Sequence, residues 1–304
     1  MGIVVTKALT MVLIILMGYI LKRVRYLDKA YFPMLSRISL NIMLPCVIIT
    51  KFSEFTMDYA FLIFVLIGLG LNLLTVGIGY VAGARRGRDA QAFYMINLSG
   101  FNIGSFALPF AQTFLGADGV VATCLFDAGN SMMCTGGTYA LASTVAAQGE
   151  KQTPAAFLKK LFSSIPLDTY LIMLLLSILG LHLPAFITSF ASTVGNANSF
   201  LAMLVIGVGL ELHLNREQVR RVLKCLAFRY VFAAVLALTL YRLLPFSLEV
   251  RQAMALIAFA PLSLLCPVYT HRCGGDESLS STLNSLSIVT STVCMTVLLL
   301  LFNI

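Results

Sequence analysis

The chain is a series of apolar stretches separated by short polar segments. Most of the stretches are about 20 residues long, enough for a helix to span the hydrocarbon core of a bilayer. Lipid offers no partner for unpaired backbone groups, and there is no pattern of short alternating strands, so the stretches predict helices. We expect an all-α membrane protein with ten transmembrane helices at 4–22, 31–51, 59–83, 91–115, 118–147, 166–182, 185–211, 219–243, 250–271 and 277–303.

One long polar connection divides these spans into two groups of five. We therefore expect a first five-helix repeat at 1–147, a cytoplasmic linker at 148–165 and a second repeat at 166–304. Because five is odd, the two halves enter the membrane in opposite orientations, and this predicts a 5+5 inverted repeat of the kind found in secondary transporters.

A short alignment between the halves supports the repeat. LPFAQTFLGAD (108–118) and CPVYTHRCGGD (266–276) align at one constant offset, in the fourth span of each half. The offset pairs Pro109 with Pro267, Gly116 with Gly274, and Asp118 with Asp276.

Composition and charge agree with a membrane protein. Hydrophobic residues make up 59% of the chain and charged residues 11%, whereas soluble domains contain about 25% charged residues. Fifteen basic residues lie in loops after odd-numbered spans and four on the opposite side. Cytoplasmic loops are enriched in Lys and Arg, so we expect a multi-pass protein of the cell membrane, plasma or bacterial inner, with both termini outside. The same bias explains the net charge of +8 without a nucleic-acid partner.

Two predicted spans contain helix-breaking residues near their centres. Span four contains Gly100, Gly104 and Pro109, and span nine contains Pro261 and Pro267. A proline inside a helix removes a hydrogen bond, and at membrane depth the freed groups are tolerated only where protein or a water-filled cavity covers them. We expect the two helices to unwind and cross, with half-helix N-termini facing an anion; packing kinks are the alternative.

The stretch FNIGSFALP resembles the broken fourth span of the auxin efflux carrier family. The matching positions are Asn102, Gly104, Pro109 and Gly116, while Phe101 and Ala107 stand where that family usually has glycine. GYILKR (18–23), LNIMLPCVIITKF (40–52), APLSLLCP and GGD extend the resemblance over essentially the whole chain. It implies a ten-helix organic-anion carrier, like bacterial malonate or malate permeases, with a fold similar to that of sodium–bile acid symporters.

Asp127 lies about ten residues into span five, near the predicted midplane. An acid in a membrane span is a functional candidate, because its burial is costly. We expect it to take up and release a proton during transport, or else to bond structurally to a neighbouring helix.

Further polar residues in the broken spans and their neighbours are candidates for a substrate pocket. Amide and hydroxyl groups can bind a carboxylate or a cation, or they can tie helices together. At the constant offset, Ser285 is the counterpart of Asp127. Asn72, Asn196 and Asn198 are candidates for holding a coupling ion. The substrate-binding candidates are Asn97, Asn102, Gly104, Pro109, Asn130, Pro261, Ser263, Pro267, Tyr269, Asn284 and Ser285.

Two arginines, Arg37 and Arg229, lie about two turns inside the cytoplasmic ends of their spans. Snorkelling to the interface explains such positions, and a gating or substrate-guiding role is the alternative. The seven cysteines contain no CxxC and the three histidines no metal-ligand spacing, so we expect neither a disulfide framework nor a metal site.

The leading functional hypothesis is secondary transport of a mono- or dicarboxylate, coupled to protons and without a cofactor. Sodium coupling of the bile-acid-carrier type, a uniporter, and a ligand-binding receptor of the same fold are the alternatives, and a homodimer is left open. No GxxxxGK[ST] motif indicates nucleotide use. An intramembrane aspartyl protease would need Asp127 and Asp276 to face each other, and CGGD departs from the GxGD pattern at Cys273.

Overall fold

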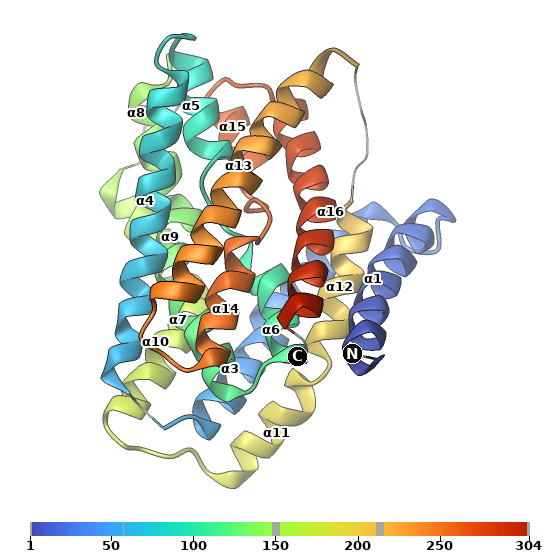
Figure 1. The fold of residues 1–304 in the computed structure, drawn as a ribbon, viewed down its shortest axis with the longest axis vertical. Coiled ribbons are helices and arrows are strands. Elements are labelled where there is room, and N and C mark those ends of the chain that lie inside the picture. The colour runs from blue at the N-terminus through green and yellow to red at the C-terminus, as the bar shows by residue number, and fades with distance from the viewer. Residues whose placement is uncertain (1, 57, 148–152, 211–215, 303–304) are drawn as a thin grey trace.

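The computed structural model describes residues 2–56, 58–147, 153–210 and 216–302, and the described chain is helical without strands (Figure 1). Helix lies in each of the ten predicted segments. The first half contains α1 (Gly2–Arg23), η1 (Lys29–Tyr31), α2 (Phe32–Ile38), η2 (Ser39–Met43), α3 (Leu44–Glu54), η3 (Tyr59–Leu62), α4 (Ile63–Gly83), α5 (Arg88–Asn97), η4 (Ile103–Ala107), α6 (Leu108–Phe114), α7 (Ala117–Met132), η5 (Met133–Gly137) and α8 (Thr138–Val145).

The second half follows the predicted linker, whose residues 148–152 lie outside the described residues and whose remainder includes a short helix. The elements are α9 (Pro154–Leu161), α10 (Ile165–Ile178), α11 (Ala185–Gly195), α12 (Asn198–Gly209), α13 (Arg216–Leu243), α14 (Leu248–Ala258), α15 (Cys266–Arg272) and α16 (Glu277–Phe302).

Six apolar helical segments of the described chain are long enough to cross a membrane. Of the other predicted spans, three are interrupted, because their helices break or change to π-helical turns, and the fourth contains α10, a shorter apolar helix of 14 residues. Large hydrophobic side chains such as Leu13, Leu66 and Val235 lie exposed on these helices, as lipid-facing surfaces require. The chain is therefore a multi-pass membrane protein. The six segments are Val5–Arg23, Phe32–Glu54, Tyr59–Gly83, Ala185–Gly209, Val219–Leu243 and Glu277–Phe302.

Spans four and nine are broken, as predicted. Between α5 and η4, residues 98–102 are not α-helical, and between α14 and α15 the same holds for 259–265. Gly100 has a φ of +78°, which glycine adopts without steric cost.

The prolines act differently from the sequence prediction. Pro267 does not interrupt a helix but lies in the first turn of α15, directly after the second break. Pro109 lies where η4 changes from π-helical to α-helical turns at the start of α6, within one continuous helical run from 103 to 114. A first-turn residue has no helical N–H bond to lose, so Pro267 stabilises the restart of α15.

The helices pack as two sets. The first set contains α1, α2, α3, α10, α11 and α12, with α1 along α12 and α3 against α10 and α11. The second set contains α4 to α8 and α13 to α16, in which α4 packs on α5 and α7, and α14 on α13 and α7. Fewer elements meet between the sets: mainly α3 and α10 against α7, α12 against α6, and α1 against α16 (Figure 1).

Glycines allow the closest helix contacts within each set. A Cβ on Gly68 of α4 would lie 2.2 Å from the carbonyl oxygen of Phe126, and one on Gly129 of α7 would lie 2.0 Å from that of Val65. Small residues let membrane helices approach until their backbones touch. The α4–α7 contact therefore holds the helix that carries Asp127 against its neighbour.

We predict that Gly68→Ala destabilises the protein by about 2 kcal/mol or more, because the new methyl group cannot fit against α7. Gly70→Ala on the same helix is the matched control, since a Cβ there meets nothing within 4 Å. The measurement is the melting temperature of each purified variant in detergent. Equal melting temperatures for the two variants would contradict this account of the packing.

Candidate functional site

The two breaks meet at the centre of the second helix set. The backbone N–H of Asn102 donates to the carbonyl oxygen of Pro261 at 2.9 Å. Beside this contact lies a void of only about 10 Å³, lined in part by Gly100, Cys134 and Ser263. The two broken segments, which the sequence predicts to cross, are therefore in direct contact and closely packed in this conformation.

Asn130 of α7 holds the first break. Its Nδ2 donates to the carbonyl oxygen of Phe101 at 2.8 Å, and its Oδ1 accepts from the Phe101 N–H at 3.2 Å. Asn72 of α4 extends this support, because its Nδ2 donates to Asn130 Oδ1 at 3.1 Å and its Oδ1 accepts from the Gly100 N–H at 3.0 Å. Both amides replace hydrogen bonds that the unwound backbone has lost.

The long helix α16 holds the second break in a comparable way. Nδ2 of Asn284 donates to the carbonyl oxygen of Ser263 at 2.8 Å, and the Leu262 N–H donates to Oγ of Ser287 at 3.1 Å. Sequence reasoning identified Asn284 and Ser263 but missed Ser287. A serine in an apolar helix gives no indication of which backbone group it faces.

Asp127 lies against the first break and is 5% exposed. Asn130 Nδ2 donates to its Oδ1 at 2.8 Å, and the Tyr170 hydroxyl donates to its Oδ2 at 3.0 Å. A Cβ on Gly104 would lie 3.4 Å from Oδ2, so this predicted residue also faces the carboxylate. Tyr170 belongs to α10 of the first set, and its bond to Asp127 therefore joins the two helix sets.

The side chain of Asn102 differs from the other amides at the crossing. It is 7% exposed, and its Nδ2 has no hydrogen-bond partner among the described residues. Nearly all buried polar groups are paired, so an unpaired donor requires an explanation. An amide N–H of this kind can donate to a carboxylate oxygen of a bound anion.

Other predicted residues tie helices together away from Asp127. Asn97 Nδ2 donates to Thr270 Oγ1 at 2.9 Å, and Asn97 Oδ1 accepts from Ser280 Oγ at 2.5 Å. The Tyr269 hydroxyl donates to the carbonyl oxygen of Thr135 at 2.6 Å. Ser285 is buried on α16 next to Asn284.

The snorkelling interpretation was wrong for Arg229, which is buried and 6% exposed. Its Nη1 donates to the carbonyl oxygen of Leu98 at 3.2 Å. Its Nη2 lies 2.7 Å from the oxygen of Gly100, 3.1 Å from that of Ala260 and 3.3 Å from that of Pro261. One guanidinium thus bonds to both breaks. Arg37, by contrast, is exposed, as snorkelling predicts.

The aspartyl protease arrangement is not found. Asp276 is exposed, and its Oδ1 accepts from the Leu279 N–H at 2.9 Å, which caps α16. Asp127 is buried at the crossing, so the two carboxylates do not form a facing pair.

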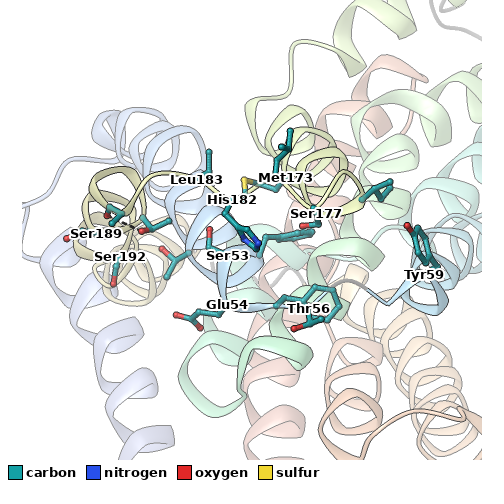
Figure 2. A pocket seen from close by; sticks show the side chains of 18 residues that line it. Ser53, Glu54, Thr56, Tyr59, Met173, Ser177, His182, Leu183, Ser189 and Ser192 are labelled. Atoms are coloured by element: carbon teal, nitrogen blue, oxygen red, sulfur yellow. Dashed lines mark hydrogen bonds between the residues drawn. The ribbon is translucent and has the colours of Figure 1, made fainter.

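Open cavities lie at the two ends of the molecule. One, of about 890 Å³, lies where α3 meets the α10–α11 connection and is lined by hydroxyl side chains such as Ser53 and Ser177 around His182 (Figure 2). Its lining includes Met173, one turn after Tyr170 on α10. The other, of about 700 Å³, is lined by the ends of α5 and α13 and by the segment before α16. None of the predicted site residues lines either cavity.

Comparison with known proteins identifies the family of the chain. No curated protein sequence matches the chain significantly. The family model described as membrane transport protein matches residues 3–299. Since that match covers almost the entire sequence, the chain belongs to this membrane transport family of auxin efflux carrier type.

Proposed function

We propose that the protein is a secondary transporter that carries a small organic anion, a mono- or dicarboxylate, by alternating access, and that proton uptake and release at Asp127 couple this transport to the proton gradient. The observation that carries the proposal is the unpaired amide of Asn102 at the crossing of two broken helices. The Nδ2 atoms of Asn72, Asn97, Asn130 and Asn284 each donate at least one hydrogen bond within the protein. Nδ2 of Asn102 donates none among the described residues, so both of its N–H groups are available to a substrate carboxylate.

The arrangement of the helices supports ten spans in an inverted repeat. The broken-span helices α6 and α15 are both seven residues long. Each helix set also draws on both halves: the first set on predicted spans one, two, six and seven, the second set on the remaining six. Such a division is typical of carriers in which one repeat-derived bundle moves against the other around a central site.

Proton coupling is proposed from the position of Asp127. The carboxylate lies beside the anion-binding break and bonds through Tyr170 to the opposite helix set. Protonation replaces an acceptor oxygen by a hydroxyl and so changes this bond. The proton state of Asp127 would then control how firmly the two sets are held together.

The end cavities supply access routes in this proposal. The cavity of about 890 Å³ would open to the outside, where the loop-charge pattern also places both termini. The cytoplasmic cavity is lined by Arg86, Arg220, Arg221 and Lys224 against Asp89 and Asp276. Its excess of positive charge would raise the local concentration of an organic anion.

The substrate proposal is tested by thermal stability in the presence of a panel of organic acids. Ligand bound only to the folded state raises the melting temperature. We expect one class of carboxylate to raise the melting temperature of the wild type by about 5 °C. The same acid should raise the melting temperature of Asn102→Ala by less than about 1 °C. Exposed Asn196→Ala is the control and should respond like the wild type. If no acid shifts the wild type, or if Asn102→Ala keeps the full shift, the anion site is wrong.

Proton coupling is tested with Asp127→Asn in liposomes. We expect substrate accumulation driven by a pH gradient to fall about tenfold or more, because the side chain no longer titrates, while exchange of labelled for unlabelled substrate continues. Asp118→Asn, an exposed acid on the same helix, should accumulate substrate normally. Undiminished pH-driven accumulation in Asp127→Asn would favour a uniporter or another coupling ion, and loss of exchange as well would assign Asp127 to substrate binding.

Tyr170→Phe removes the hydrogen bond between the two helix sets but keeps Asp127, the proposed proton-binding residue. Loss of a hydrogen bond to a charged group costs about 2 kcal/mol, so we expect a melting temperature lower by about 5 °C. Asp127 remains, and a pH gradient should still drive accumulation. Abolished accumulation at an unchanged melting temperature would instead place Tyr170 on the proton pathway.

A further inference from the structure

The environment of the Arg229 guanidinium consists of backbone carbonyls. They follow the C-terminal ends of α5 and α14, the two helices that run into the crossing. The Phe101 ring covers the group, with its centroid 5.3 Å from Cζ. Among the described residues, no carboxylate forms an ion pair with Arg229.

Such a group of carbonyls favours a positive charge. The C-terminal end of a helix carries partial negative charge, and two such ends converge here. In transporters with broken helices, unwound carbonyls and half-helix C-termini are the groups that coordinate a transported or coupling cation. Here the chain's own guanidinium bonds to these oxygens and keeps its charge at any physiological pH.

We propose that the Arg229 guanidinium is a built-in substitute for an inorganic coupling cation, so that the crossing of this carrier needs no Na⁺. One consequence of this inference, that sodium does not drive transport through this site, rests on the proposed transport function. The physical claim concerns the carbonyl cluster, and it is testable without any substrate.

A variant that retains the positive charge distinguishes the proposed role from a role in packing alone. Lysine keeps the positive charge but cannot reproduce the planar fork of arginine donors. We therefore expect Arg229→Lys to retain part of the wild-type stability and Arg229→Ala to leave four carbonyls without a cation. Arg242→Ala removes an exposed arginine from the same helix and serves as the matched control.

The experiment measures melting temperatures in NaCl, KCl and choline chloride at equal ionic strength. We expect the wild type and Arg242→Ala to differ by less than about 1 °C among the three salts. Arg229→Ala should melt at least about 5 °C lower than the wild type. Millimolar methylguanidinium should raise the melting temperature of Arg229→Ala but not that of the wild type, because it can refill the vacated carbonyl cluster.

Several results would overturn the proposal. One is specific stabilisation of the wild type by Na⁺; another is an Arg229→Ala protein as stable as the wild type. If Arg229→Ala does not fold, the test relies on the wild-type salt series and on Arg229→Lys. An Arg229→Lys protein that is no more stable than Arg229→Gln would then overturn the proposal. Failure of every organic acid to bind would reject the proposed substrate class and leave these results unaffected.

Discussion

The structure depends on satisfying the backbone groups that two broken helices expose at membrane depth. In a bilayer core these groups have no water to bond. Asn72 and Asn130 supply partners for the first break, and Asn284 and Ser287 supply them for the second. Arg229 bonds to carbonyls at both. This requirement explains why amides, hydroxyls and one guanidinium occur inside spans that are otherwise apolar.

Few polar side-chain groups at the crossing are not engaged in supporting the unwound backbone, and these few indicate a function. The Asn102 amide has an unused donor, and Asp127 bonds outward to Tyr170 on the other helix set. The same cluster therefore contains an amide donor without a protein partner and a titratable group on the boundary between the two helix sets. In the proposed transport cycle, anion binding and movement of the helix sets would share these few neighbouring side chains, as coupling between them requires.

Rigidity within the sets and weaker packing between them have separate physical origins. Glycines such as Gly68 and Gly129 bring backbones of one set into contact, which leaves no space for independent movement. Between the sets, much of the specific bonding comes from a few polar side chains, including Tyr170. Motion of one set against the other would break those bonds and spare the breaks, which lie wholly within the second set.

The sequence by itself determined the helical class, the positions of the apolar segments, the two broken spans and the burial of Asp127, because hydrophobicity and helix-breaking residues act locally. It also indicated Asn130 and Asn102 as candidates. Only the tertiary structure decided that Asn130 supports the break while Asn102 keeps a free donor, that Tyr170 reaches Asp127, and that Arg229 points inward. Those outcomes depend on which helices face each other across sequence separations that range from 29 residues for Asn130 and Phe101 to 129 for Arg229 and Gly100. A polar side chain in an apolar span does not reveal its partner.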